Sequence, residues 1–406
     1  MDHAALTELD NQSLDWRCRT VGSDAHEYSI AQWLSSRPRL EHLPTPSLAL
    51  AGSAVEHNVR VMAQWCHDRG VAIAPHGKAT MAPQLWSKQL AAGAVGITLA
   101  SVAQARVARA FGVRRILIAN QVIDAAELTE LSRWAADGIE VTHFVDSPAA
   151  VAALDALPAG APSLDVCVEL GAPGGRAGAR SLTAAAEVAR LVEAHPRARL
   201  VGVAAYEGVI TSGTEASDLA DVAAYLEDVV SLYSSCDFAT DSPMVTAGGS
   251  AYFDIVASVL GRLAPVAEIV LRCGAYLSHD HGFYARLTPF ARGGDGPQLR
   301  PALLSRSRVL ALPEPGRAIL DAGRRDLPFD QGLAHPVDED GIRLPGLTMS
   351  AIADQHAFLT GETSGLVVGE VLTLGPSHPC TAFDKWGLIP VVSDDGIVVE
   401  AVHTFF

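Results

Sequence analysis

One lysine in the first quarter of the chain follows directly after a short apolar run. Lys78 lies in the segment 75–80, at the end of the run 71–75. When an apolar surrounding desolvates a lysine, its pKa falls and the neutral amine can form a Schiff base with a carbonyl compound. A solvated position in a loop is the commoner fate of a lone lysine, and the position of Lys78 by itself is compatible with both.

Glycine-rich or aromatic segments end three further apolar runs. The segment 171–178 carries several glycines and one cation, Arg176, which such a loop can bring close to a flat ligand. Tyr206 ends another run, and the small residues 248–250 precede a helical pattern. Small residues that open a helix can bind a phosphate through backbone N–H groups. Each segment also fits an ordinary turn, in which glycine supplies a positive φ.

A histidine and a cysteine near the C-terminal end lie two positions apart. Side chains with the spacing of His378 and Cys380 point to the same side of an extended segment, so they can bind one ion. Imidazole nitrogen and thiolate sulfur together favour zinc, and two protein ligands leave positions open for water and substrate. His356 is a candidate for a further ligand or for a group that supports one. A surface or core histidine and a buried thiol without an ion are the commoner explanations.

The elements that must position these residues follow a repeating pattern. Continuous apolar runs alternate with alanine-rich helical stretches, which is typical of βα units with a parallel sheet covered on both faces. Eight such units fit a (β/α)₈ barrel, in which the chemistry lies at the carboxyl ends of the strands. An open doubly wound sheet is the alternative, but no GxGxxG follows the first run. The runs are 47–51, 71–75, 95–100, 115–120, 141–146, 164–170, 201–207 and 244–249.

The sequence pattern changes after about residue 265. Short β-rich runs are then separated by turns such as 394–396, and helical periodicity is nearly absent. We therefore predict an α/β fold with three parts. These are an N-terminal segment 1–44 that packs on the β domain, a (β/α)₈ TIM-type barrel over 45–284, and a C-terminal all-β domain over 285–406.

Charge and composition exclude several classes of protein. The chain has 30 Lys and Arg against 46 Asp and Glu, a net charge of −16, whereas nucleic-acid binders usually carry basic clusters. No apolar run reaches the ~18 residues of a membrane span, and the first residues do not resemble a signal peptide. The six cysteines are scattered without a CxxC pair, as in reduced cytoplasmic proteins. We therefore expect a cytoplasmic protein that has neither nucleic acid nor a membrane as its partner.

Five short motifs occur in the order and spacing of one enzyme family. In these motifs the chain resembles the D-serine dehydratase and D-threonine aldolase group of fold-type III, alanine racemase-like enzymes, which use pyridoxal 5′-phosphate (PLP). The resemblance extends from about residue 40 to 390 and implies a barrel followed by a C-terminal β domain. The motifs are Pro75-His76-Gly77-Lys78-Ala79-Thr80, Tyr206-Glu207-Gly208, Gly248-Gly249-Ser250, Arg272-Cys273-Gly274-Ala275-Tyr276 and His378-Pro379-Cys380.

The resemblance implies a role for each matching residue. Lys78 would bind PLP covalently, and Arg176 would face the pyridine nitrogen, where a cation keeps that nitrogen unprotonated and the ring a weaker electron sink. Tyr206 would pack near the ring. His378 and Cys380 would bind a divalent metal, and the cysteine favours the dehydratase branch and Zn²⁺ over Mn²⁺. The other cofactor-binding residues would be His76, Gly248, Gly249, Ser250, Gly274 and Tyr276.

The resemblance therefore predicts a lyase that acts on a small-molecule D-3-hydroxy amino acid. The leading hypothesis is a PLP- and zinc-dependent dehydratase that converts a D-serine-like substrate into a 2-oxo acid and ammonia. One alternative is metal-dependent retro-aldol cleavage to glycine and an aldehyde, and another is a non-catalytic PLP carrier, although such carriers generally consist of the barrel alone. A racemase would leave the metal pair without a role. Because related barrels often pair, we expect a homodimer.

Overall fold

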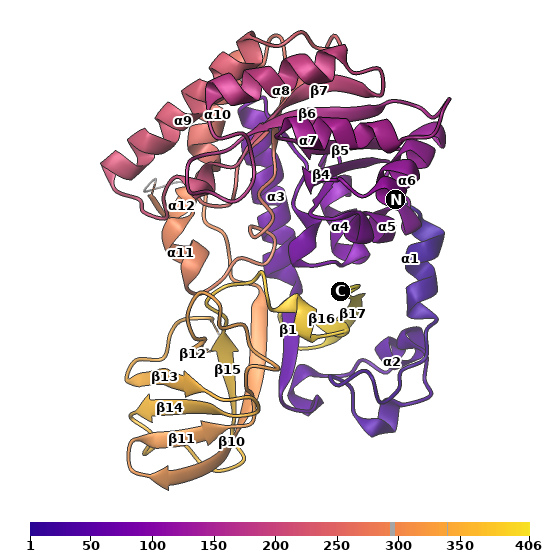
Figure 1. Ribbon diagram of the computed structural model, residues 1–406. Coiled ribbons are helices and arrows are strands. Elements are labelled where there is room, and N and C mark those ends of the chain that lie inside the picture. Colours follow the sequence, from indigo (N-terminus) through magenta and orange to yellow (C-terminus); the bar gives the residue numbers. More distant parts are fainter. Residues whose placement is uncertain (293–296, 339) are drawn as a thin grey trace.

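The computed structural model describes residues 1–292, 297–338 and 340–406, and within them the strands form two sheets (Figure 1). One sheet has eight parallel strands in the order β2-β9-β8-β7-β6-β5-β4-β3, and the other has nine strands that are mostly antiparallel. The parallel sheet carries helices on its outside, and the second sheet lies below it in Figure 1. The predicted fold class, a (β/α)₈ barrel with a C-terminal β domain, is confirmed.

The barrel strands are short and largely buried, as expected for strands covered on both faces. An isolated parallel bridge between His76 and Thr98 joins the two ends of the strand order, and the Thr98 hydroxyl donates to the Ala74 carbonyl at 2.6 Å. The strands are β2 (Ala72–Ile73), β3 (Ile97–Leu99), β4 (Arg115–Gln121), β5 (Glu140–Val145), β6 (Leu164–Leu170), β7 (Ala198–Ala205), β8 (Met244–Ala247) and β9 (Glu268–Leu271).

Four of the helices around the barrel, α5 to α8, begin directly after a capping residue. Ser101, Asp124, Ser147 and Ser181 each accept a backbone N–H from the first turn of the helix that follows, which satisfies donors that have no partner inside the helix. The helices are α3 (Gly52–Asp68), α4 (Pro83–Ala91), α5 (Val102–Ala110), α6 (Ala125–Ala136), α7 (Pro148–Ala152), α8 (Leu182–Ala194), α9 (Ala216–Ser234) and α10 (Phe253–Leu260).

The prediction for the first strand is wrong. β1 (Ser47–Ala51) pairs antiparallel with β10 (Leu303–Glu314) and parallel with β16 (Leu388–Val392), so it belongs to the second sheet. The missing barrel strand is β9, which lies after the eight predicted runs. A continuous apolar run does not distinguish a barrel strand from a central strand of another sheet, because both are buried on two faces. The segment 248–250 therefore follows the seventh barrel strand and not the eighth.

The second sheet combines β1 with the C-terminal strands. Its order is β13-β14-β11-β10-β1-β16-β17, and β15 pairs with both β10 and β12. Two short helices, α11 (Phe283–Leu287) and α12 (Pro289–Arg292), lie between the barrel and this sheet (Figure 1). The remaining strands are β11 (Arg317–Leu320), β12 (His335–Val337), β13 (Leu347–Ile352), β14 (Ala357–Gly361), β15 (Val371–Gly375) and β17 (Val398–His403).

The first residues and α3 join the parts of the molecule. The N-terminal segment contains α1 (His3–Asp10) and α2 (Ile30–Ser35), and its buried Ile30 and Trp33 share a core cluster with residues of β16 and β17. The first half of α3 packs on the second sheet and its second half on the barrel. Within the described residues, no helix has the length and apolarity that crossing a bilayer requires.

The position of β1 in the second sheet predicts the effect of a core truncation. Leu50 is fully buried there among residues of α3, β16 and the segment after β15. Leu50→Ala should lower the free energy of unfolding by about 2–5 kcal/mol, because it removes buried methyl groups and leaves a cavity. Ile123→Ala, at a side chain that is 67% exposed, should change it by less than about 0.5 kcal/mol. Urea unfolding of both variants measures the difference.

Candidate active site

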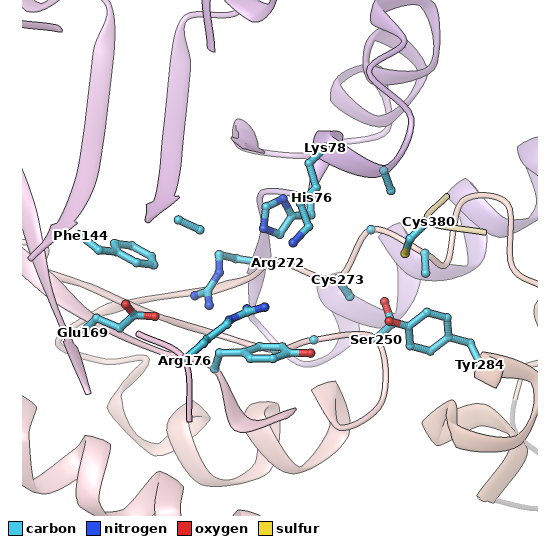
Figure 2. A pocket seen from close by; sticks show the side chains of 17 residues that line it. His76, Lys78, Phe144, Glu169, Arg176, Ser250, Arg272, Cys273, Tyr284 and Cys380 are labelled. Carbon is cyan, nitrogen blue, oxygen red and sulfur yellow. The ribbon is translucent and has the colours of Figure 1, made fainter. Parts of the chain in front are cut away.

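A cavity opens at the carboxyl ends of the barrel strands. It encloses about 680 Å³, part of which is open to solvent, and side chains from the linker after β9 and from the second sheet complete its wall. Figure 2 shows Lys78, Arg176 and Arg272 converging on its centre. The structure thus brings most of the predicted site residues together. The predicted residues that line the cavity are His76, Lys78, Arg176, Tyr206, Gly248, Gly249, Ser250, Gly274 and Cys380.

Lys78 lies in a 3₁₀ turn, Gly77–Ala79, which residues 74–76 connect to β2. A Cβ atom on Gly77 would come within 2.8 Å of Trp86 and of Ile97, so only glycine lets this turn pack so closely against the helix and strand that follow. Burial lowers the pKa of Lys78, and the nearby positive charge of Arg176 lowers it further. The amine is therefore more available as a nucleophile or base than the amine of a solvated lysine.

Two arginines supply the positive charge in the cavity. The guanidinium carbon of Arg176 lies 4.5 Å from the centroid of the Tyr206 ring, which is a cation–π contact. Arg272 is buried, and its guanidinium donates to the Thr246 hydroxyl at 2.8 Å and to the Ala205 carbonyl at 2.6 Å. Arg272 has no role that the sequence alone predicts, because nothing in its local motif shows which way the side chain points.

The backbone N–H groups of the predicted phosphate cup are only partly free. The N–H groups of Gly248 and Gly249 donate to the carboxylate of Glu207, at 3.1 and 2.6 Å. In the described part of the chain, the N–H groups of Ser250, Gly274 and Ala275 donate to no protein acceptor, although all three residues line the cavity. Free N–H groups after the seventh and eighth strands are the usual means of phosphate binding in this type of barrel.

Besides the buried His378, two further predicted residues, Tyr276 and His356, do not line the cavity. The side chain of Tyr276 lies in the barrel core, where its hydroxyl accepts from the Gln89 amide at 3.0 Å. It is therefore not a wall of the phosphate site. His356 is exposed in the turn between β13 and β14, so it neither lines the cavity nor joins the predicted metal pair. Motif order along the chain does not reveal that these two side chains point elsewhere.

The predicted metal pair lies in the segment after β15, at the edge of the cavity. Cys380 lines the cavity, and burial raises the pKa of its thiol to about 12. His378 is buried, and its Nδ1 lies 2.7 Å from a carboxylate oxygen of Asp330. This contact orients the ring and leaves Nε2 for another partner, as in carboxylate–histidine–zinc arrangements. Tyr284, which also lines the cavity, packs on the His378 ring with a centroid distance of 5.5 Å.

The predicted metal pair, His378 and Cys380, remains a prediction. The described residues contain no group of three or more His, Cys, Asp or Glu that could hold a metal ion, so a bound ion would depend on water or substrate for its other positions. The role of Asp330 was missed in the sequence analysis. Asp330 is 48 residues from His378 in the chain, and no local pattern links the two.

The other groups of the cavity fit PLP. A buried Nδ1 of His76 has no hydrogen-bond partner among the described residues, and burial lowers the pKa of this imidazole well below its usual value. Glu169, which the sequence analysis left without a role, accepts from the Gln121 amide at 2.7 Å and lines the same cavity. The cavity thus combines a neutral imidazole and a carboxylate with a lysine whose pKa is lowered, two arginines and free N–H groups. Together these groups define a site for a phosphorylated aldehyde cofactor.

Comparisons with known proteins agree with this class of site. Residues 51–254 match the family model described as "Alanine racemase, N-terminal domain", and residues 302–392 match "Putative serine dehydratase domain". The chain is 29% identical to the D-threonine aldolase of Arthrobacter sp. over 369 residues, which covers 89% of this chain and 92% of the relative. It therefore belongs to the D-serine dehydratase and D-threonine aldolase-like family of fold-type III, alanine racemase-like PLP enzymes.

Solved structures of related proteins have the same architecture. The D-threonine aldolase of Filomicrobium marinum matches with a TM-score of 0.77 and 26% identity, over 89% of this chain and 95% of that one. D-threo-3-hydroxyaspartate dehydratase from Delftia sp. HT23 matches with a TM-score of 0.73 and 21% identity, over 91% and 99%. The structure of a variant of D-threo-3-hydroxyaspartate dehydratase in which a histidine is changed to alanine has also been solved. A second variant, in the metal-free form, has the cysteine two positions further along changed to alanine.

The depressed pKa of Lys78 predicts a pH dependence for covalent PLP binding. A lysine whose pKa is lowered from 10.5 loses its proton at a lower pH, so the rate of reaction with PLP should rise and level off below pH 10.5. Borohydride trapping at a series of pH values, followed by peptide mapping, measures this rate. Lys88 serves as the internal reference. It is a partly exposed lysine that pairs with Glu400 at 2.9 Å. Labelling at Lys88 instead of Lys78 would contradict the assignment.

Proposed function

We propose that the protein is a PLP- and zinc-dependent dehydratase of a D-3-hydroxy amino acid, with a 2-oxo acid and ammonia as products. The observation that carries this proposal is that Cys380 and Lys78 line one cavity, while Asp330 orients the neighbouring His378. A base for the Cα proton and a metal pair for the β-hydroxyl are the two functions that such an elimination requires. The His-x-Cys spacing also equals the spacing of the two changed residues in the dehydratase variants.

The chain's own residues would divide the work as follows. PLP, when bound, supplies an electron sink that makes the substrate's Cα–H bond more acidic. Lys78 would take the Cα proton, and its lowered pKa increases the neutral fraction of the amine at any given pH. His378 and Cys380 would hold Zn²⁺, which supplies Lewis acidity at the β-hydroxyl, a poor leaving group. Arg176 would face the pyridine nitrogen of the cofactor, and Tyr206, whose ring centroid lies 4.5 Å from the guanidinium carbon of Arg176, would pack near the cofactor ring.

Retro-aldol cleavage to glycine and an aldehyde is the second candidate. It is favoured by the relatives, since the D-threonine aldolases of Arthrobacter sp. and Filomicrobium marinum are 29% and 26% identical to this chain. Both reactions use the same lysine and the same metal pair, and they differ in which bond of the substrate breaks. Elimination needs a proton for the leaving hydroxyl, whereas cleavage needs a base that removes the hydroxyl proton.

A non-catalytic PLP carrier is a weaker candidate. The segment between β15 and β16 contributes Cys380 to the cavity wall, and helix α11 contributes Tyr284, so the site extends beyond the barrel. A carrier would have no use for a thiol and an oriented imidazole beside the cofactor. The homodimer and the cytoplasmic location expected from the sequence remain predictions.

The products distinguish the candidates. Purified protein supplemented with PLP and Zn²⁺ is incubated with the D and L forms of serine, threonine and 3-hydroxyaspartate, and 2-oxo acid, ammonia, glycine and aldehyde are quantified. We expect 2-oxo acid and ammonia from D substrates only, because the family resemblance places Lys78 on the side that removes the proton of a D amino acid. Glycine with an aldehyde would establish the aldolase instead, and equal turnover of L substrates would contradict the stereochemical assignment.

The metal pair gives a separate prediction. Cys380→Ala should abolish bound zinc and elimination but leave PLP binding intact, because the residues that would hold PLP lie in the barrel. Asp330→Asn should weaken zinc binding by about tenfold to a hundredfold, since it removes the carboxylate that orients His378. Cys18→Ala, a thiol outside the cavity, is the matched control. Elemental analysis and activity after EDTA treatment are the measurements, and unchanged turnover without metal would refute the mechanism.

A further inference from the structure

We propose that Glu207 is a positioning residue that sets the shape of the phosphate-binding loop through two hydrogen bonds to its glycines. The inference rests on the part of the proposed function in which this cavity binds PLP. It goes beyond that function because Glu207 would touch neither cofactor nor substrate. Its effect would be confined to the phosphate end of the site.

The contact between Glu207 and the loop is bidentate and fully buried. Glu207 opens a 3₁₀ turn, Glu207–Val209, directly after β7, and its side chain has no exposed surface. One carboxylate oxygen accepts the N–H of Gly249 at 2.6 Å, and the other accepts the N–H of Gly248 at 3.1 Å. Two hydrogen bonds to one rigid carboxylate fix the position and the orientation of both peptides. Hydrogen bonds to a carboxylate are also stronger than hydrogen bonds between neutral groups.

The loop needs such an anchor because its residues are conformationally free. Gly248 has a φ of +95°, which side-chain-bearing residues rarely adopt. A Cβ atom on Gly249 would lie 2.8 Å from the Tyr206 ring, so that position has to remain glycine. Two consecutive glycines lose a large conformational entropy when they are ordered, and the carboxylate offsets this cost. The next residue, Ser250, is the first whose N–H is free toward the cavity.

The opposite side of the same loop is held by Arg272. The Arg272 N–H donates to the Gly248 carbonyl at 3.2 Å, and its guanidinium bonds to Thr246 and Ala205. Burial raises the pKa of Glu207, whereas the N–H groups of Gly248 and Gly249 and, after them, the positive charge of Arg272 act in the opposite direction. The cup for the phosphate is thereby reduced to the N–H groups of Ser250, Gly274 and Ala275, which donate to no acceptor in the described residues.

The test compares two aldehydes that differ only in the phosphate. Apoprotein is titrated with PLP and with pyridoxal, and the absorbance of the lysine-bound aldehyde is followed. Glu207→Gln replaces one of the two acceptor oxygens by an NH₂ donor, which cannot accept a glycine N–H, and leaves an uncharged oxygen as the other acceptor. The loop should therefore no longer be held in its present conformation. We expect the affinity for PLP to fall by about tenfold or more, the equivalent of one charge-assisted hydrogen bond, while the affinity for pyridoxal changes little.

The matched control is Asp326→Asn. Asp326 is also buried and accepts a backbone N–H, from Gly323 at 2.9 Å, but it lies outside the cavity. If this variant alters binding at all, it should alter both aldehydes equally. Glu207→Asp keeps the charge on a shorter side chain and should fall between wild type and Glu207→Gln. Circular dichroism of each apoprotein establishes that the variants are folded.

Three outcomes would overturn the proposal. An equal loss for PLP and pyridoxal would show a general structural role, and an unchanged affinity for PLP would show that the anchor is dispensable. A gain in PLP affinity would show that the carboxylate competes with the phosphate for the glycine N–H groups. Failure of the wild-type protein to bind PLP would instead refute the proposed function, so the two failures are distinguishable.

Discussion

The burial of Arg272 is the constraint on which the rest of the site depends. A buried guanidinium is costly unless its donors are satisfied, and Arg272 meets this requirement by bonding to Thr246 in β8 and to the last residue of β7, Ala205. The residue itself follows β9, so one side chain ties together the ends of three neighbouring strands. The loops after these strands carry Glu207, the glycines 248–249 and Gly274. Because the strand ends are fixed relative to one another, the starting points of these loops are fixed as well.

Positive charge in a confined space also sets the chemistry of the cavity. Arg176 and Arg272 both disfavour the protonated form of Lys78, in addition to the effect of burial. His76 has its pKa lowered by burial and then by Lys78, so the imidazole is neutral beside the lysine. A site that concentrates fixed cations beside a neutral His76 is suited to anionic ligands such as a phosphate or an amino acid carboxylate.

The second sheet completes the site in a way that the barrel alone could not. β1 crosses from the N-terminal segment into the centre of this sheet, and α3 then contributes side chains to a core cluster of the barrel and to a core cluster of the sheet, so this helix joins the two parts. The segment after β15 can therefore place Cys380 in the wall of the barrel cavity. Tyr284 bridges the two parts, because it lines the cavity and packs on His378.

The sequence by itself determined the barrel, the β domain and most of the cavity wall, because βα alternation and glycine-rich strand ends are local patterns. It did not determine that β1 leaves the barrel, since burial on both faces has the same apolar signature in either sheet. Nor did it show that Tyr276 points into the core or that Glu207 takes the N–H groups of Gly248 and Gly249. Those outcomes depend on which side chains meet across strands and loops far apart in the chain, and only tertiary packing decides that.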